Sequence, residues 1–297
     1  MSISKKPLIT VRIPAYNHEV YIARALKSVL NQTYENIQLI VIDDGSKDRT
    51  PEIIQKFADK NDFTFIRQSN VGVSETMNRI HSLTKGEFVF GCASDDFLEE
   101  GAIEKLVNKA LQTGADIVCG RVMTVDDENE NRGELNFNCK NKFNKQDLIK
   151  LRSFTPKQGY FYRKSLLDKI LPIPNTVKLE DAYVFLKLPN NTNFVSLNEI
   201  VKYYRVHDNN TIADQWYMYS RKRELIQKYA NNRRDYIYIL ASKLSWFNDL
   251  AYRYPKEAIK YFVPAIIFVV RSGFSKRAIE KFISGTLKLL KINLSKF

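Results

Sequence analysis

The segment NIQLIVIDDGSKDRT (residues 36–50) decides the fold class. Its first half is a nearly continuous apolar run, which is typical of a β-strand covered on both faces of a parallel sheet. The run ends on two adjacent acids, Asp43 and Asp44. A helix is predicted directly afterwards, from a Thr50 cap and a proline at the first helical position to about Lys60.

The flanking sequence continues this alternation of strands and helices. Runs rich in β-branched and aromatic residues predict further strands at residues 7–14, 63–68, 87–93 and 115–125. Periodic apolar positions predict further helices at residues 19–31, within 69–83 and at 99–114. This order favours an α/β fold with a mostly parallel sheet flanked by helices. In such sheets the ligand crevice lies beyond the carboxyl ends of the strands, where the acids are.

The composition is that of a folded protein in a reducing compartment. Hydrophobic residues make up 44% and charged residues 27% of the 297 residues, which excludes a disordered chain. The three cysteines, Cys92, Cys119 and Cys139, fit neither a zinc site nor a disulfide framework. The opening stretch MSISKKPLITVRIP shows no signal-peptide pattern, so we expect a cytoplasmic protein.

The net charge of +13 is concentrated in the last third of the chain. Residues 213–297 hold 17 Lys and Arg against 6 Asp and Glu, whereas residues 1–212 hold 29 against 27. We therefore expect an α/β domain over residues 1–212 and a basic, mostly helical region over residues 213–297. A basic region of this kind is typical of proteins that bind an anionic membrane or nucleic acid.

A second acid pair, Asp95 and Asp96, follows the apolar run EFVF at the same expected edge of the sheet. Adjacent carboxylates repel each other and are costly to bury unpaired. One interpretation is a cap for the helix that begins near Glu99. The other is a divalent cation, because two hard oxygen donors on a tight turn suit Mg²⁺ or Mn²⁺. A cap explains one acid but not both, which favours the cation.

Four motifs together resemble the inverting family 2 glycosyltransferases, which have the GT-A fold. They are TVRIPAYNHEVYIARALKSVLNQTYENIQLIVIDDGSKDRT (10–50), NVGVSETMNRI (70–80), GEFVFGCASDD (86–96) and LEDAYVF (179–185). The resemblance implies a Rossmann-like domain, residues 1–212, that binds a nucleotide sugar and carries out catalysis. It implies transfer of a hexose or N-acetylhexosamine from a UDP-sugar to a hydroxyl of a glycan, either a bacterial surface polysaccharide or a lipid-linked oligosaccharide.

By this resemblance, the donor nucleotide lies in the crevice at the strand ends. Asp44 is expected to hydrogen-bond the uracil ring. Asp43 is either a second ligand contact or a structural carboxylate. The remaining residues that the family pattern places around the base are Pro14, Ala15, Tyr16, Arg67 and Asn70.

The segment Ser94-Asp95-Asp96 matches the DXD motif of the family, with Ser in the first place. The resemblance makes Asp96 the direct ligand of Mn²⁺ or Mg²⁺, and Ser94 and Asp95 contacts of the donor, with Asp95 at the ribose or a metal-bound water. The stretch YYRVHDNNT (203–211) resembles a later family segment. In it, Arg205 and His207 are candidates for diphosphate binding, and His207 is either an additional metal ligand or an ordinary surface residue.

Glu180 and Asp181 match the ED motif of the family. An inverting transfer needs one base that takes the proton of the acceptor hydroxyl as it attacks. The resemblance assigns this role to Asp181, with Glu180 as a supporting or acceptor-binding group. The alternative is a pair of acids favoured at a helix N-terminus by its dipole. Of the other histidines, His18 is expected to face solvent and His81 to lie within a helix without a role.

The basic C-terminal region leaves three interpretations open. The apolar run YFVPAIIFVV (261–270) is shorter than the roughly 20 residues that span a bilayer. RAIEKFISGTLKLLKINLSKF (277–297) has the pattern of a basic amphipathic helix. The region either packs on the catalytic domain, attaches to the inner face of the cell membrane, or self-associates.

Two rival functions are weighed against sugar transfer. A basic nucleic-acid-binding protein would explain the charge of the C-terminal region but leaves the acid pairs without a role, so no nucleic-acid partner is expected. A non-catalytic donor-binding protein on the same fold would keep the crevice but not the base.

Overall fold

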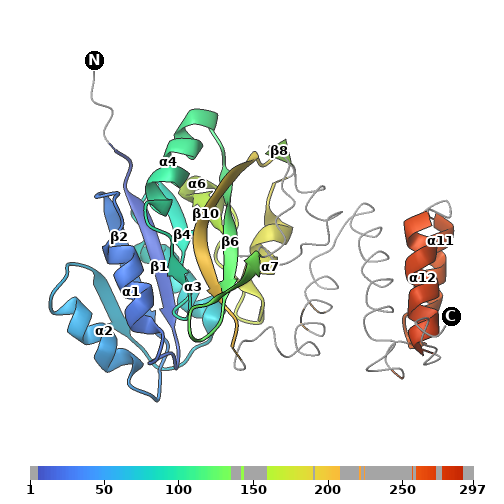
Figure 1. Cartoon of the computed structure of the whole chain (residues 1–297), viewed down its shortest axis with the longest axis horizontal. Coiled ribbons are helices and arrows are strands. Elements are labelled where there is room, and N and C mark those ends of the chain that lie inside the picture. The colour runs from blue at the N-terminus through green and yellow to red at the C-terminus, as the bar shows by residue number, and fades with distance from the viewer. Residues whose placement is uncertain are drawn as a thin grey trace. The chain divides into compact units, whose positions relative to one another are not determined.

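A computed structural model of the chain describes residues 6–134, 142–143, 159–189, 191–207, 221, 224, 256, 259–271 and 276–289. The chain divides into two compact units, residues 1–214 and 215–297. The first unit contains a sheet with flanking helices, and the described part of the second contains two helices (Figure 1).

The first unit begins with regular alternation of strands and helices, as the sequence predicts. Its strands are β1 (Ile9–Ala15), β2 (Ile37–Asp43), β3 (Thr64–Arg67), β4 (Phe88–Gly91), β5 (Phe97–Leu98), β6 (Ile117–Val125), β7 (Asn131–Glu134), β8 (Lys142–Phe143), β9 (Tyr160–Arg163) and β10 (Phe194–Arg205). Its helices are α1 (Ile22–Leu30), α2 (Thr50–Ala58), α3 (Val73–Leu83), α4 (Ala102–Thr113), α6 (Lys164–Leu167) and α7 (Glu180–Lys187).

Four strands form a parallel half of the sheet, in the order β3-β2-β1-β4. Three successive residues of β2 (40–42) are fully buried, as expected for a strand covered on both faces. The register places Ala15 beside Asp43 and Asp43 beside Arg67. These strands therefore end together at one edge of the sheet.

The other half of the sheet is mixed rather than parallel. β9 lies antiparallel between β4 and β6, and β10 runs parallel to β6. The two-residue strand β5 pairs antiparallel with β10, so that Phe97 lies opposite Tyr203 and Leu98 opposite Lys202. The α/β class is confirmed. The second half of the sheet combines one parallel pair, β6 with β10, with strands such as β5 and β9 that run antiparallel to their neighbours.

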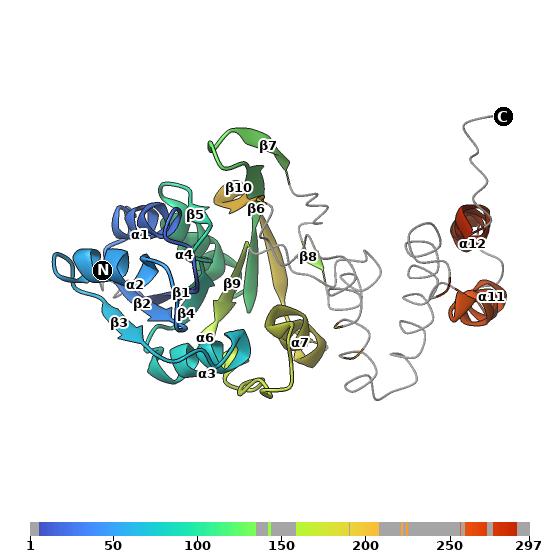
Figure 2. The ribbon, with the colours of Figure 1, turned by 90° about the horizontal axis from the view of Figure 1, so that it is seen from below.

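Helices cover both faces of the sheet (Figure 2). α1, α2 and α4 lie on one face, and α3 and α7 lie on the other. Aliphatic residues of α1 and α4 pack with those of β1 and β2 in one continuous core, which includes Val11, Leu26, Val41 and Leu106. Burial of such apolar surface is the main stabilising term of a core of this kind.

Two helices begin differently from the prediction. α1 begins at Ile22 rather than near Glu19, and α2 includes Thr50, with Arg49 at its N-cap position. The Thr50 hydroxyl accepts a hydrogen bond from the backbone N–H of His18 instead of capping its own helix. The start of α2 is thereby joined to the loop that precedes α1.

The described part of the second unit contains α11 (Phe262–Arg271) and α12 (Lys276–Leu289). These helices pack against each other, with the rings of Phe262 and Phe282 5.4 Å apart. The predicted helical character of the region agrees with these two helices, and most of residues 213–255 lies outside the described residues. None of the helices in the described part of the chain is long and apolar enough to cross a membrane.

Candidate active site

The loops after β1 and β2 are joined by hydrogen bonds at the carboxyl edge of the parallel strands. The N–H of Asn17 donates to Ser46 Oγ (2.9 Å), and the N–H of Lys47 donates to the side-chain oxygen of Asn17 (2.8 Å). Asn17 has a φ of 52°, a left-handed conformation in which asparagine is enriched. The N–H of His18 then donates to Thr50 Oγ1 (2.8 Å). The two loops form one connected rim.

The carboxylate of Asp44 holds the loop that follows β3. It accepts hydrogen bonds from the N–H groups of Val71 and Gly72 and from the side chain of Gln68, each at 2.9 Å. The predicted contact of Asp44 with a uracil ring stays a prediction. In the structure its oxygens organise residues 68–72.

Gly45 and Asp43 complete this corner of the rim. Gly45 has a φ of +75°, and a Cβ at this position would lie 2.6 Å from the backbone nitrogen of Asn70. Only glycine combines this backbone conformation with such a close approach. Asp43 accepts the N–H of Ser46 (3.1 Å), and its other oxygen is buried with no hydrogen-bond partner among the described residues.

The turn after β4 directs its two acids to different surroundings. The N–H of Asp96 donates to the carbonyl of Ala93 (3.1 Å) and closes the turn. The Asp96 carboxylate is shielded from solvent, with Lys202 Nζ 2.9 Å away and the N–H of Arg205 donating at 3.0 Å. Burial raises the pKa of Asp96 to about 6, although the charge of Lys202 opposes the increase. Neither acid caps α4, whose N-cap residue is Gly101.

Asp95, His18 and His207 form a group of three candidate metal ligands. One ligand atom of each residue lies within 4.8 Å of the other two. His207 Nε2 is 3.2 Å from Asp95 Oδ2, and His18 Nδ1 is 2.7 Å from Ser94 Oγ. Two imidazoles and a carboxylate are a donor set that divalent first-row metals accept. The residues present therefore fit a divalent metal ion.

This group differs from the predicted set of ligands. Asp96 was expected to bind the metal, but the structure places its carboxylate against Lys202 and brings Asp95 to the two histidines instead. The expectation that His18 faces solvent is wrong, because its ring is half-buried and contacts Ser94. His207 lies within this group, and its role as a metal ligand stays a prediction.

The three side chains of this group shift one another's pKa values. Burial alone would raise the pKa of Asp95, but the hydrogen bond with His207 and the nearby His18 and Lys202 lower it below its ordinary value. The hydrogen bond with Asp95 raises the pKa of His207, whereas burial lowers the pKa of His18. Metal binding requires an ionised carboxylate and neutral imidazoles. The lowered pKa values of Asp95 and His18 favour that state, whereas the raised pKa of His207 means that metal binding must displace its proton.

Arg205 and Tyr21 hold the group in place. Arg205 donates from Nε to the Asp95 carbonyl (3.0 Å) and from its guanidinium to the Asp126 carbonyl. The guanidinium lies 4.9 Å from the centroid of the Tyr21 ring, and that ring stacks on His207 at 5.1 Å. Because the Arg205 side chain is buried and its donors are engaged, this geometry makes it a positioning residue and not the predicted diphosphate ligand.

Helix α7 begins with the predicted acid pair Glu180 and Asp181. Burial raises the pKa of Glu180 to about 7, and the adjacent charge of Asp181 adds to the increase. Burial also raises the pKa of the Tyr204 phenol, and the carboxylates of Asp96, Asp95 and Asp181 raise it further. Tyr204 is therefore within electrostatic range of both acidic segments.

Hydrogen bonds to α3 hold the segment that precedes α7. Ser74 Oγ donates to the carbonyl of Val177 (2.6 Å). The Asn78 side chain donates to the carbonyl of Ile173 (2.8 Å) and accepts its N–H (2.7 Å). The acid pair is thus carried on a segment that hydrogen bonds fix to α3.

The other residues predicted at the donor base lie at the strand ends. Pro14 and Ala15 are the last residues of β1, and Tyr16 follows with an exposed ring. Arg67 ends β3, and Asn70 lies in the loop after it; both are exposed. The structure brings these residues to the rim, where an aromatic ring and a cation are open to a ligand.

Sequence analysis missed the role of Lys202. Its side chain is buried in β10, between the apolar Val201 and the aromatic Tyr203 of the sequence. Lysine is almost never fully buried unless it is paired, so a lysine inside a strand pattern was the available signal. The partner, Asp96, is 106 positions earlier and could not be identified from spacing.

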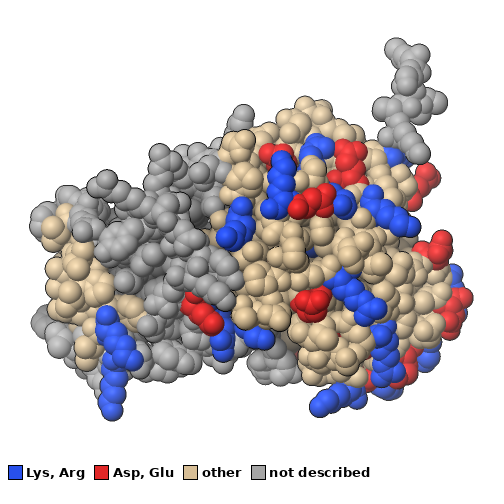
Figure 3. Space-filling model, turned by 180° about the vertical axis from the view of Figure 1, so that it is seen from behind, with Lys and Arg blue, Asp and Glu red and all other residues tan. Residues whose placement is uncertain are grey.

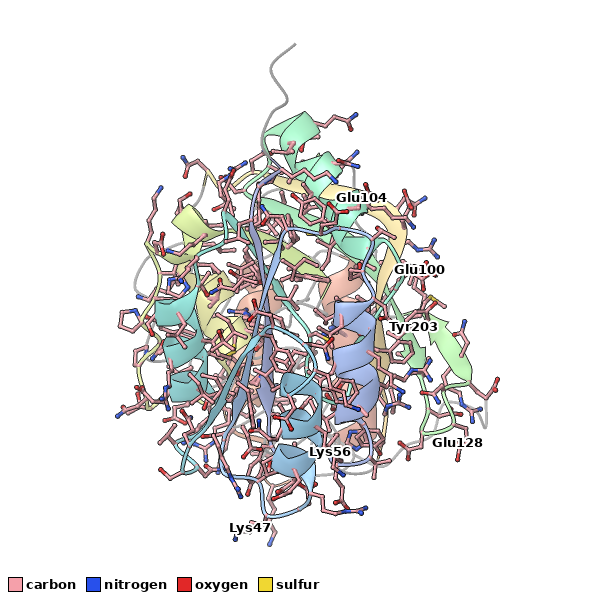
Figure 4. All side chains as sticks on the ribbon, turned by 90° about the vertical axis from the view of Figure 1, so that its left-hand side faces the viewer. Lys47, Lys56, Glu100, Glu104, Glu128 and Tyr203 are labelled. Carbon is pink, nitrogen blue, oxygen red and sulfur yellow. The ribbon has the colours of Figure 1, made fainter. Side chains whose placement is uncertain are left out.

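A separate polar cleft of about 720 Å³ lies beside α1 and β5. Its lining includes Arg24, Asn31, Glu100 and Tyr203, and none of the three candidate metal ligands lines it. Glu100 and Tyr203 are labelled on this side of the unit in Figure 4. The cleft is therefore distinct from the rim that carries the predicted donor residues.

Solved structures with the same fold are glycosyltransferases. Staphylococcus aureus TarS, in a structure with UDP-GlcNAc, matches with a TM-score of 0.67 and 16% identity over 96% of this chain and 89% of that one. The mannosyltransferase PcManGT from Pyrobaculum calidifontis, with GDP-Man and Mn²⁺, matches with a TM-score of 0.59 and 16% identity over 97% and 88%. The fold is GT-A.

Sequence relatives define the family. The profile of glycosyl transferase family 2 matches residues 10–171. An uncharacterized glycosyltransferase of Haemophilus influenzae is 34% identical over 182 residues, 61% of this chain and 71% of its own length. GlyA of Streptococcus pneumoniae and the hyaluronan synthase of Pasteurella multocida are 35% and 29% identical over 43% and 80% of this chain, but the chain spans only 18% and 24% of their lengths. The chain belongs to glycosyl transferase family 2 and is a glycosyltransferase.

Proposed function

We propose that the protein is a metal-dependent, inverting transferase that moves a hexose or N-acetylhexosamine from a UDP-sugar to a hydroxyl of a growing glycan. The TarS structure of the same fold contains UDP-GlcNAc, and one sequence relative is a hyaluronan synthase. The acceptor that we propose is a surface polysaccharide or a lipid-linked oligosaccharide.

In this proposal the uridine of the donor binds at the rim formed by the loops after β1, β2 and β3. Tyr16 offers an exposed ring, and Arg67 offers an exposed cation. Asp44 shapes the rim by holding residues 68–72. The Asp44 carboxylate accepts three hydrogen bonds from this loop, and a carboxylate has about four acceptor positions, so one position would serve a hydrogen bond from uracil.

His18, Asp95 and His207 would hold the divalent metal ion, which is either Mn²⁺ or Mg²⁺. When bound, the ion neutralises negative charge on the nucleoside diphosphate leaving group. The chain keeps the three ligands in register before binding, since Arg205 holds the Asp95 backbone and Tyr21 stacks on His207. Such preorganisation lowers the cost of forming the reactive arrangement.

Asp181 would accept the proton of the acceptor hydroxyl. Burial and the adjacent charge of Asp181 raise the pKa of Glu180 to about 7, so Glu180 holds its proton more readily near neutral pH than an ordinary glutamate does. The acceptor oxygen attacks the anomeric carbon from the side opposite the diphosphate. Its proton passes to the Asp181 carboxylate as the bond from the anomeric carbon to the diphosphate breaks.

The observation that carries this proposal is the meeting of His18, Asp95 and His207 at the turn after β4. A thermal-shift screen of nucleotide sugars with and without Mn²⁺ tests it, because a ligand that binds the native state raises the melting temperature. We expect a UDP-sugar to stabilise the protein only when Mn²⁺ is present.

Asp95→Asn should abolish this stabilisation. Asp168→Asn is the matched control, because Asp168 is a partly exposed carboxylate that also contacts a histidine, His81, at 2.9 Å. Absence of any shift with Mn²⁺ and the full set of nucleotide sugars would contradict the proposed donor class.

A further inference from the structure

Helix α11 has two apolar faces, and only one of them is covered. Ala265 and Val269 are buried, as expected for the side of a helix that packs on its own unit. Val263, Ile266, Ile267 and Val270 are 62%, 39%, 37% and 52% exposed. Their spacing of i, i+3, i+4 and i+7 places all four on one stripe of the helix. We call these four residues the α11 stripe.

The α11 stripe is unusual among the exposed apolar residues of this chain. In the first unit the exposed large aliphatic residues are scattered, as Leu111 of α4 is, and single residues of this kind need no explanation. The α11 stripe is continuous, and Ile259 just before the helix is also 60% exposed. A continuous apolar surface bordered by polar residues marks an interaction site.

Positive charge accompanies the stripe. Lys256 and Lys260, just before α11, are exposed, and residues 213–297 hold 17 Lys and Arg against 6 Asp and Glu. The first unit is different, because Lys, Arg, Asp and Glu are interspersed over the surface seen in Figure 3. The partner of the stripe must therefore combine an apolar interior with a negative surface.

We propose that the α11 stripe docks on an anionic lipid bilayer, with the helix lying in the plane of the membrane surface. Aliphatic side chains enter the boundary between head groups and acyl chains, while lysines contact anionic head groups. A second copy of the chain is a poorer partner, since pairing this face with itself would bring two strongly basic regions together. Docking of this kind does not depend on which sugar the enzyme transfers.

Sedimentation of the full-length protein with vesicles tests the apolar contribution. Binding is expected to phosphatidylglycerol-containing vesicles and to be much weaker to pure phosphatidylcholine. Ile267→Gln with Val270→Gln should weaken binding roughly tenfold or more, because two aliphatic side chains are lost from the buried surface. Leu111→Gln, which changes an exposed aliphatic residue of α4, is the control and should bind like the wild type.

A second pair of variants tests the charge contribution. Lys256→Gln with Lys260→Gln should bind vesicles more weakly than the wild type at low salt. Adding salt should weaken vesicle binding of this variant less than that of the wild type, because salt screens the charges that the variant lacks. Lys56→Gln on α2, an exposed lysine labelled in Figure 4, is the control. Unchanged vesicle binding by the Ile267/Val270 variant overturns the proposal. So does a fall in molecular mass by light scattering in that variant, which would assign the stripe to self-association.

Discussion

The ammonium group of Lys202 lies 2.9 Å from the carboxylate of Asp96, and the two side chains are only 1% and 0% exposed. The pair joins β10 to the turn after β4, the same turn that presents Asp95 to His18 and His207. A buried ion pair of this kind adds little net stability, but removing only one of its two charges strongly lowers the free energy of unfolding. In this structure the pair holds the Asp96 side chain in the interior, while the adjacent Asp95 side chain lies beside the two histidines.

Removing the lysine alone should therefore be strongly destabilising. Lys202→Met leaves the Asp96 carboxylate buried without its counter-charge, and we expect a loss of about 3–5 kcal/mol in the free energy of unfolding. The double variant Lys202→Met/Asp96→Asn should recover most of that loss. Urea denaturation measures both. The exposed pair Lys105–Glu199, at 3.0 Å, provides the control: Lys105→Met should cost less than about 1 kcal/mol.

Metal binding should distinguish the two acids. We expect Mn²⁺ binding, followed by electron paramagnetic resonance of the free ion, to be lost in Asp95→Asn. In His18→Ala and in His207→Ala it should weaken by more than the roughly 10- to 100-fold that loss of an outer-shell partner costs, because each variant removes a direct ligand. Binding of Mn²⁺ should be tighter than that of Mg²⁺, since imidazole nitrogen is a poor ligand for the harder ion. Full Mn²⁺ affinity in His18→Ala would remove His18 from the site.

Activity should depend on Asp181 more than on Glu180. Asp181→Asn should lower turnover by roughly 10²- to 10⁴-fold, the range for loss of a general base, while donor binding measured by calorimetry stays near that of the wild type. Glu180→Gln keeps a neutral side chain of the same shape and should retain much more activity. If Asp181→Asn and the wild type had equal turnover, Asp181 would not be the general base.

Glu180 should also make stability depend on pH. Its pKa is about 7 in the folded protein against 4.5 for the ordinary side chain, so the folded state holds the proton more tightly. The resulting stabilisation is complete below pH 4.5 and is lost as pH rises through about 7. Glu180→Gln should thus be more stable than the wild type at pH 8, by on the order of 1–3 kcal/mol, and similar to it at pH 4.5.

The corner at Gly45 offers a structural test of the donor rim. Gly45→Ala forces a side chain into a positive-φ position and places its Cβ 2.6 Å from the Asn70 nitrogen. We expect a loss of roughly 1–3 kcal/mol and weaker nucleotide-sugar binding. Gly114→Ala has a similar φ of +62° but no atom within 4 Å, so it should cost about 1 kcal/mol and leave binding unchanged. Thermal denaturation and donor titration of both variants separate the contact from the backbone strain.

Local patterns were sufficient to predict the first half of the fold. The apolar run before Asp43 and the periodic helices around it are short-range features, and they appear as β1 to α4 with shifts of a few residues at the ends. The antiparallel insertion of β9 between β4 and β6 was not predictable, since the sequence before it, residues 126–145, is polar and carries little periodicity.

The candidate site was predictable by segment but not by side chain. The sequence placed an acid pair after β4, yet the direction of each carboxylate depends on Lys202 and Arg205, more than 100 residues later. His18 was assigned to solvent because the left-handed turn at Asn17 leaves no periodic signature. In both cases the orientation of the side chain depends on contacts with residues that are far away in the sequence.

Strand β10 has a practical consequence for anyone who recombines these enzymes. The family profile ends at residue 171, but Lys202, which pairs with Asp96 in the turn after β4, and the imidazole of His207 lie beyond that limit. A chimaera that takes only residues 10–171 from a relative would combine the relative's loops after β1, β2 and β4 with a strand β10 whose side chains do not match them. Junctions placed after residue 207 would keep each turn with the strand that evolved to hold it.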